Sequence, residues 1–394
     1  GLLVSMSVSG LADAGVSQAQ ADRLGDTLTP LGAERAGNED GSIPVWEGGL
    51  VFERPPAGEE RKPSRYQEVN DDAPIFTITQ ANLAEHADML TVGQKALFDK
   101  FSDSYSMPVY PTRRTGNAPD FVYEATARNA LSAHLENDGE SLVDAITGIP
   151  FPIPQSGKEL IWNHKLRYRG TSLRRYNTQL AVQSNGAFQP YKLREDVRFQ
   201  YNQPNVTPAS LNNVIIYFLQ FTYAPARQSG SVLLVHETMD QVAEARRAWL
   251  YNPGQRRIRR APNVAYDNPG NGSDGLRTND QLDQFNGATD RYTWKIVGKR
   301  EMYMPYNAIK LADSAVRYKD MANRSHLEQR LTRYERRRVW VLDSELRQGT
   351  SHMYKRRTYY IDEDTWSILA VDVYDGRDAL WRVQEGHLIT VPWM

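Results

Sequence analysis

The sequence predicts a mainly β (α+β) fold, in which a large curved antiparallel sheet forms a half-open barrel with helices packed on its concave face. Aromatic residues are plentiful, with 21 Tyr, 11 Phe and 8 Trp in a chain of 394 residues, and such side chains favour pleated, half-buried surfaces. After residue 170, bulky residues recur at period two in one short segment after another. These segments lie too close together for parallel crossovers, so we expect an antiparallel sheet, and a sheet this wide tends to curl.

The first fourteen residues have the pattern of a secretory signal peptide. Residues 2–11 are apolar and uncharged, and Ala12-Asp13-Ala14 is the small-x-small sequence that signal peptidases read. We interpret residues 1–14 as the remnant of such a signal, with an ordinary amphipathic helix as the alternative. No apolar run approaches the roughly 20 residues needed to span a bilayer. The expected location is therefore the periplasm, with the protein secreted across the inner membrane and soluble.

Residues 15–169 are expected to form a helical and irregular region that wraps the sheet, in one structural domain with it. Helical patterns occur at 17–28, 79–90, 91–101, 117–135 and 157–167, and Gly-, Pro- and acid-rich loops separate several of them. Thr79 and Thr91 stand where helix caps are needed. The two helices at 117–135 and 157–167 are the ones expected to lie over the sheet.

The predicted sheet occupies residues 170–394. A hairpin spans 176–201 with its turn at 184–186, and 211–223 is a strand with bulky residues on both faces. Further strands are expected at 232–235, 248–251, 256–260, 292–296 and 339–342, and three more between 352 and 390. Periodicity alone does not separate a solid core from a hollow one, because an apolar stripe lines both equally well.

Several sequence blocks together resemble one known family. The blocks are LTPLGAE (28–34), GIPFPIP (148–154), WNH (162–164), APAR (224–227), WLYNPGQRR (249–257), RRAP (259–262), DGLRT (274–278) and YIDEDTW (360–366). They resemble the secreted Gram-negative proteins grouped as domain of unknown function 1329, a family similar in fold to the outer-membrane lipoprotein carriers LolA and LolB. This resemblance implies an antiparallel half-barrel with helices in its mouth, an envelope location and the handling of hydrophobic molecules near transport systems.

Catalytic signatures are missing from the sequence. The seven histidines are scattered without a His-Glu-x-x-His pair, and neither a Gly-x-Ser-x-Gly elbow nor a Walker loop occurs. The Asx/Gly-rich segment 267–274 departs from a calcium loop, because Pro269 occupies the third ligand position. Zero cysteines exclude disulfides and thiolate metal sites. We therefore expect no enzyme activity, no catalytic residue, no metal and no cofactor.

Arginines form the most prominent polar group. Four lie in the segment 256–260, and Arg246 and Arg247 precede them. Guanidinium groups bind carboxylates and phosphates in a bidentate manner, so this hairpin could hold a lipid head group or dock a partner. The alternative is a solvated face neutralised by acids such as Glu335 and Glu345. A net charge of −1 disfavours nucleic acid.

Two functional hypotheses follow. The first is a periplasmic carrier or transport-accessory protein that binds a lipid or a lipoprotein acyl chain in the hollow of the half-barrel. The expected ligand-binding residues are Tyr217, Leu219, Phe221, Trp249, Trp294, Trp340 and Leu369, with Arg256, Arg257, Arg259 and Arg260 near the head group. The alternative is a non-enzymatic docking protein whose arginine hairpin recognises an outer-membrane or transporter partner. Peripheral membrane contact fits either hypothesis.

Overall fold

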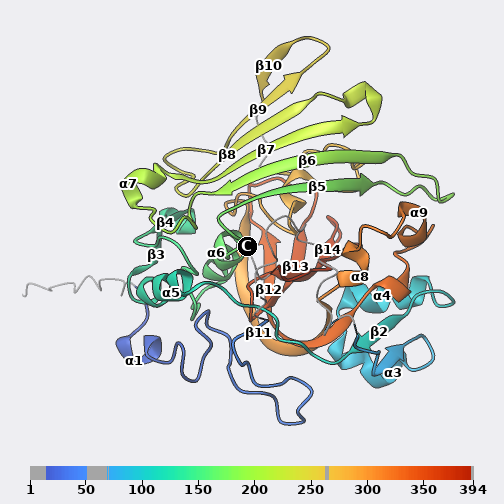
Figure 1. Ribbon diagram of the computed structural model, residues 1–394, viewed down its shortest axis with the longest axis horizontal. Coiled ribbons are helices and arrows are strands. Elements are labelled where there is room, and N and C mark those ends of the chain that lie inside the picture. The colour runs from blue at the N-terminus through green and yellow to red at the C-terminus, as the bar shows by residue number, and fades with distance from the viewer. Residues whose placement is uncertain (1–14, 51–68, 70, 262–265, 392–394) are drawn as a thin grey trace, which may run out of the picture.

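Figure 1 shows the computed structural model of the chain, which describes residues 15–50, 69, 71–261 and 266–391. Strands dominate the second half of the chain, as predicted. The predicted signal segment, residues 1–14, lies outside the described residues. None of the helices in the described part has the length and apolar character that crossing a membrane requires.

The helices are short and mostly precede residue 170. They are α1 (Gln18–Ala21), α3 (Leu83–His86), α4 (Val92–Lys100), α5 (Asp120–Ser132), α6 (Gly157–Leu166), α7 (Pro208–Leu211), α8 (Ile309–Ala312) and α9 (Tyr318–Met321). Thr91 caps α4 in a capping box with Gln94, and Ser156 caps α6 through the amide of Glu159. The helices predicted at 91–101 and 157–167 are confirmed in slightly shorter form. The helix predicted at 117–135 is present as α5, but it ends at Ser132 because residues 134–136 form a strand.

A six-stranded antiparallel sheet forms the upper layer in Figure 1. Its order is β10-β9-β8-β7-β6-β5, with β5 (Ser172–Leu180), β6 (Pro190–Phe199), β7 (Val214–Ala224), β8 (Val232–Thr238), β9 (Arg247–Asn252) and β10 (Arg257–Arg260). Each strand pairs with its neighbour in sequence, so the sheet is a simple meander. The predicted hairpin, β5–β6, is confirmed.

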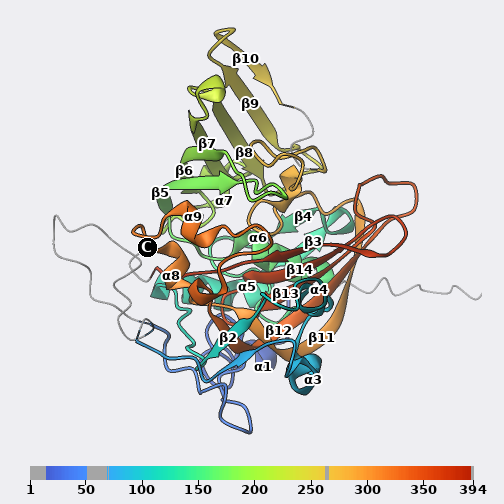
Figure 2. The same cartoon turned by 90° about the vertical axis from the view of Figure 1, so that its right-hand side faces the viewer.

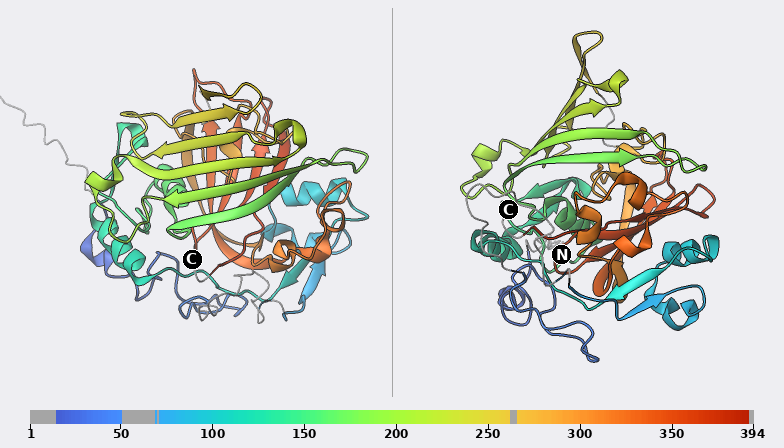
Figure 3. Two further views of the ribbon diagram at one scale, coloured as in Figure 1. Left: turned by 45° about the horizontal axis from the view of Figure 1, so that its top comes forward. Right: turned by 45° about the vertical axis from the view of Figure 1, so that its right-hand side comes forward.

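A seven-stranded sheet forms the second layer, and its strands run crosswise to those of the first (Figure 3). It contains β1 (Phe76–Ile78), β2 (Met107–Tyr110), β11 (Tyr292–Pro305), β12 (Tyr334–Leu346), β13 (Arg356–Asp362), β14 (Ile368–Tyr374) and β15 (Leu380–Glu385). The three strands expected between 352 and 390 are confirmed as β13, β14 and β15. A separate pair, β3 (His134–Glu136) and β4 (Ser141–Val143), lies beside α5.

The structure divides between two sheets the strands that the sequence analysis placed in one. The division falls between β10, which ends at Arg260, and β11, which begins at Tyr292 and pairs with β12. The second sheet also recruits β1 and β2 from the region before residue 170, with β2 parallel to the start of β12. Figure 2 shows the two layers edge-on, with α6 beneath the six-stranded sheet.

Helix α6 connects the two sheets. Leu160 and Ile161 pack into the core of the seven-stranded sheet, together with residues of β12, β13 and β14. One step along the helix, Trp162 and Leu166 pack against Tyr201 and the start of β7. Eight of the ten residues of α6 are buried, because a helix between two layers has little surface left for water. Positions on this helix are therefore fixed relative to both sheets.

A buried ion cluster joins the beginning of the described chain to the seven-stranded sheet. The guanidinium of Arg337 lies 2.8 Å from Asp362 and 2.6 Å from Asp364, and that of Arg114 lies 2.6 Å from Asp364. Arg114 also donates to the carbonyls of Glu34 and Arg35. All four charged side chains are almost fully buried, so each depends on the others for compensation.

Burial raises the pKa of Asp362, against the pull of Arg337. Burial acts in the same direction on Asp364, but Arg337 and Arg114 outweigh it and hold the pKa of Asp364 below its ordinary value. The pair of carboxylates therefore titrates as a unit.

Replacing Arg337 by Met should lower the free energy of unfolding by about 3–5 kcal/mol, because it leaves two buried carboxylates without their shared cation. Urea denaturation followed by tryptophan fluorescence measures the change. Arg300→Met on exposed β11 is the matched control and should change stability little. Equal stabilities for the two variants would contradict the role assigned to the cluster.

Candidate functional site

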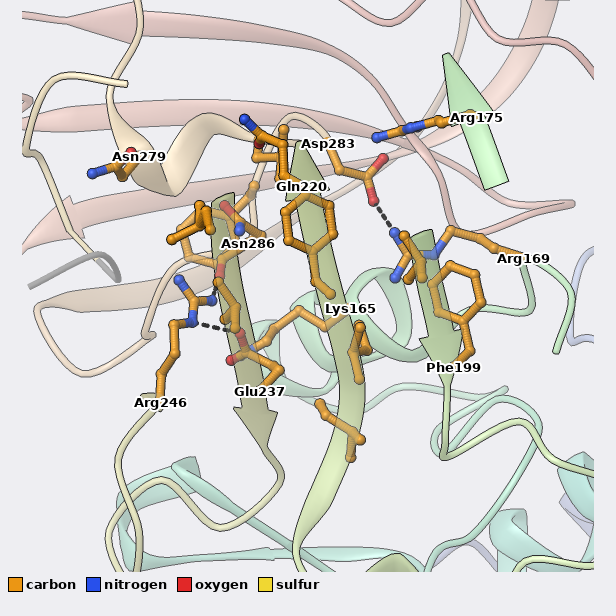
Figure 4. Close-up of a pocket in the computed structure, with 18 of the residues that line it drawn as sticks. Lys165, Arg169, Arg175, Phe199, Gln220, Glu237, Arg246, Asn279, Asp283 and Asn286 are labelled. Atoms are coloured by element: carbon orange, nitrogen blue, oxygen red, sulfur yellow. Dashed lines mark hydrogen bonds and ion pairs between the residues drawn. The ribbon is translucent and has the colours of Figure 1, made fainter. Parts of the chain in front are cut away.

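A cavity of about 210 Å³ lies between the inner face of the six-stranded sheet, the end of α6 and the segment 271–286. Figure 4 shows this arrangement, with side chains from the strands and from α6 converging on one space. Its apolar wall comes mainly from the sheet and consists of Leu173, Val197, Phe199, Ile215, Ile216, Phe218, Leu233 and Val235, with Leu282 and Phe285 opposite. An engineered apolar cavity of about 150 Å³ holds benzene, so this space suffices for a small apolar group.

Strand alternation places these side chains on one face. In β7, Ile216, Phe218 and Gln220 border the cavity, while Tyr217, Leu219 and Phe221 point to the opposite face, as period two requires. Neighbouring strands keep the register, since Phe218 pairs with Val197 and Val235. The apolar residues of β5–β8 therefore form a shared surface on the inner face, here called the apolar floor, with Phe218 between Val197 and Val235.

The polar wall of the cavity is built from carboxylates shared among cations. Asp283 lies 2.6 Å from Arg167 and 2.5 Å from Arg169. Glu237 lies 2.5 Å from Arg246 (Figure 4). Burial alone would raise the pKa of Asp283, but Arg167 and Arg169 outweigh it and keep this carboxyl ionised. These pairs fix the positions of the guanidinium groups around the apolar floor.

Glu195 is a third carboxylate near the cavity, after Asp283 and Glu237, and lies 2.5 Å from Arg175. Arg277 stands nearby and donates to the side chain of Gln179 at 3.3 Å and to the carbonyl of Thr278. Gln220 is the cross-strand neighbour of Glu195 and is itself buried against the cavity. This end of the cavity therefore offers amide and guanidinium donors beside the apolar floor.

Lys165 reaches the cavity from the last turn of α6. Its ammonium group lies 4.5 Å above the ring of Trp162 and donates to the carbonyl of Gly287 at 3.3 Å. Among the described residues, no carboxylate stands within ion-pair distance of it. Burial lowers the pKa of Lys165, and Glu237 partly offsets that effect. A buried ammonium in this setting favours an additional negative charge.

His164, the neighbour of Lys165, holds the segment 283–285 against α6. Its Nε2 lies 3.0 Å from the carbonyl of Asp283 and 3.2 Å from that of Phe285, so we assign the proton to Nε2. Its Nδ1 then accepts from the amide of Ile368 at 3.2 Å. Burial lowers the pKa of His164 to about 3, and the ring is neutral at physiological pH.

A second cavity, of about 560 Å³, lies at the beginning of α6 beside Gly15 and Trp294. Both of its cations are paired, with Lys158 2.7 Å from Glu140 and Arg347 2.6 Å from Asp138, and Glu159 adds a further carboxylate to the lining. It lacks the excess of cations that distinguishes the first cavity, and we regard the first as the candidate site.

The predicted ligand-binding residues lie elsewhere. Tyr217, Leu219, Phe221 and Trp249 are half-buried on the outer face of the six-stranded sheet, where the rings of Tyr217 and Trp249 contact His236. Trp294 lines the second cavity, Trp340 packs beside the core of the seven-stranded sheet, and Leu369 is fully buried in that sheet. The structure thus brings together four of these seven side chains, and none of the seven lines the first cavity.

The four hairpin arginines are grouped as predicted. Arg256, Arg257, Arg259 and Arg260 are exposed on the β9–β10 hairpin and do not line the first cavity. Glu335, one of their expected neutralising partners, is buried and lies 2.7 Å from Arg333 instead. The arginines that line the cavity come from other segments.

Sequence reasoning missed Lys165, Arg169, Arg277 and Asp283 as site residues. Bulky residues occur on both faces of β7, which predicts that both faces are covered. This alternation does not indicate which of the two faces borders a cavity. Arg277 lies in the block DGLRT (274–278), but neither that block nor the residues around Asp283 have a pattern that predicts a cavity wall. The nearest sequence signal for Lys165 is the block WNH (162–164), which immediately precedes it.

Stability should fall as the pH drops from 7 to 5, in part through His164. Its pKa in the folded state is about 3, against an ordinary value of 6.5, so below pH 6.5 the unfolded chain takes up a proton that the folded chain does not. The expected loss from this group at pH 5 is about 2 kcal/mol. Urea titrations of wild type and His164→Gln at both pH values measure it.

The variant should be less stable at pH 7 but should lose less on acidification. His134→Gln, which changes a half-exposed histidine, should retain the wild-type decline. An undiminished decline in His164→Gln would contradict the assignment of a neutral, buried ring.

Comparisons with known proteins place the chain in one family. A family model described as "Protein of unknown function (DUF1329)" matches residues 77–394. Uncharacterized protein PA3922 of Pseudomonas aeruginosa strain PAO1 is 48% identical over 386 residues, which cover 96% of this chain and 84% of that protein.

Two solved structures are similar in part. One is described as an outer membrane lipoprotein-sorting protein domain from Vibrio parahaemolyticus, with 16% identity and a TM-score of 0.35 over 56% of this chain and 73% of that chain. The other is LolA superfamily protein NE2245 from Nitrosomonas europaea, with 10% identity and a TM-score of 0.32 over 58% and 75%. The family model and the Pseudomonas relative together show that the chain belongs to the DUF1329 family.

Proposed function

We propose that this protein is a non-catalytic carrier of the cell envelope, located in the periplasm, that binds a hydrophobic molecule in the cavity beneath the six-stranded sheet. The observation that carries the proposal is the apolar floor formed by β5–β8, which borders an unfilled space rather than a packed layer. Burial of apolar surface stabilises a bound ligand by roughly 25 cal/mol per Å² removed from water. The lipid or lipoprotein acyl chain expected from the sequence is the class of ligand that suits such a floor.

The surrounding framework supports a carrier with a preformed site. Helix α6 is packed against both sheets, and His164 ties the segment 283–285 to it. A site whose walls are held in this way spends little conformational entropy on binding. The proposal requires no covalent step, and the ion-paired side chains of the wall act as positioning groups.

Phe218→Gln should weaken binding of a fluorescent acyl probe by about 10-fold, because it places a polar amide on the apolar floor. Leu219→Gln is the matched control, one residue along β7 and on the opposite face. It should leave the affinity near that of wild type. Fluorescence titration, with circular dichroism as a check of folding, measures both.

These two variants, together with Trp249→Gln, distinguish binding on the inner face of the six-stranded sheet from binding on its outer face. If Leu219→Gln or Trp249→Gln weakens binding and Phe218→Gln does not, the ligand occupies the outer face expected from the sequence. In that case the cavity is not the binding site.

A docking role is the second candidate function, and the β9–β10 hairpin favours it. This hairpin forms the edge of the six-stranded sheet at the top of Figure 1. Its four arginines flank Ile258 in the sequence, and Ile258 is 68% exposed. Within the described residues, no carboxylate pairs with any of the four. Unpaired guanidinium groups at an exposed edge suit an acidic surface of the envelope.

Changing Arg256, Arg257, Arg259 and Arg260 together to Glu should abolish sedimentation of the protein with anionic vesicles at low salt. Neutral vesicles serve as the control, and raising the salt concentration should release the wild-type protein because exposed charges are screened. Equal sedimentation of wild type and variant would remove the support for docking through this hairpin.

A further inference from the structure

The charges around the cavity are unbalanced. Five cationic side chains line it, Lys165, Arg169, Arg175, Arg246 and Arg277, against the two carboxylates of Glu237 and Asp283, an excess of three positive charges. Three of the five cations have a carboxylate partner, since Arg169 pairs with Asp283, Arg175 with Glu195 and Arg246 with Glu237. Lys165 and Arg277 have no ion-pair partner among the described residues. A buried charge without a partner is costly, and Lys165 is buried, so its position beside an apolar surface favours an anionic group in the cavity.

Lys165 is the cation best placed to receive that anion. Glu237, the nearest carboxylate of the cavity wall, already binds Arg246 at 2.5 Å. Glu140 and Asp290 also act on Lys165, but Glu140 is engaged by Lys158 and Thr289 and Asp290 accepts from Tyr266. Figure 4 shows Lys165 beside Glu237 and Arg246, at the end of the cavity formed by α6 and β8.

The apolar floor begins directly beside this cation. Ile216 pairs with Glu237 across β7 and β8, and Phe218 follows one step along the inner face. A ligand whose charged group meets Lys165 would therefore lay its apolar part along Ile216 and Phe218. Gln220, which is also buried, lies further along the same row.

We infer that the ligand of this cavity is an amphipathic anion, with a carboxylate or phosphate bound by Lys165 and an apolar part on the inner face of β7. This inference rests on the proposed carrier function and specifies the chemistry of its cargo. Hydrogen bonds to a charged group are stronger than neutral ones, so the anion would supply both affinity and orientation.

The test compares octanoate, octyl phosphate and 1-octanol by isothermal titration calorimetry with the full chain. These ligands share the same apolar chain and differ in the head group. Octanoate or octyl phosphate should bind about 10-fold more tightly than octanol, and the better of the two anions identifies the head group. Lys165→Gln should remove most of this preference while leaving octanol binding near its wild-type value.

Two variants serve as controls. Lys192→Gln removes an exposed cation from the outer face of β6 and should preserve the preference. Arg277→Gln removes a cavity cation at the other end, and a loss of preference in this variant alone would overturn the assignment to Lys165. Thermal denaturation checks that each variant is folded.

The outcomes separate this inference from the proposed function. Equal affinity for octanol and for the anions, unchanged in Lys165→Gln, would overturn the anionic head group while leaving the hydrophobic carrier intact. Absence of binding for all three ligands, together with an unaltered acyl-probe titration in Phe218→Gln, would overturn the carrier proposal itself.

Discussion

The buried ion cluster of Arg114, Arg337, Asp362 and Asp364 is the interaction on which the relative placement of the segments depends. It joins residues far apart in sequence, since Arg114 binds both the backbone at Glu34 and Arg35 and the turn that follows β13. Taking these charges out of water is costly, and only complete pairing compensates for that cost. Any arrangement that leaves one of them alone is strongly disfavoured. The cluster therefore selects one way of wrapping the N-terminal region around the seven-stranded sheet.

Helix α6 links the two sheets and borders the cavity with its last turn. Its buried side chains contact both sheets. His164 and Lys165 are adjacent in its last turn and have different roles. The histidine is neutral and fixes the cavity wall through two carbonyls, whereas the lysine lies in the cavity without an ion-paired partner among the described residues. Adjacent side chains on a helix differ in direction by about 100°. One turn of α6 can therefore direct His164 toward the segment 283–285 and Lys165 into the cavity. The cavity therefore has a wall that is held by packing against both sheets.

The two faces of the six-stranded sheet give the protein two separate surfaces. The inner face combines an apolar floor with an excess of cations, and the outer face carries half-buried aromatic residues that end at the exposed arginine hairpin. A single strand, β7, supplies bulky residues to both. Ligand binding on one side and docking on the other are therefore compatible functions, and substitutions at neighbouring positions on β7 report on them independently.

The amino-acid sequence by itself determined the β-rich class, the β5–β6 hairpin, the closing strands β13–β15, helices α4, α5 and α6, and the family, because these depend on local periodicity, caps, turns and contiguous motifs. Tertiary structure alone decided the division into two sheets, the face of β7 that borders the cavity, and the pairing of charges such as Arg114 with Asp364. The alternation of side chains along a strand shows which residues share a face, but it does not show what packs against each face. Lys165 on α6 and Arg277 and Asp283 in the segment 271–286 converge only after these two parts of the chain fold against the six-stranded sheet. Neither part alone therefore indicates the excess of positive charge around the cavity.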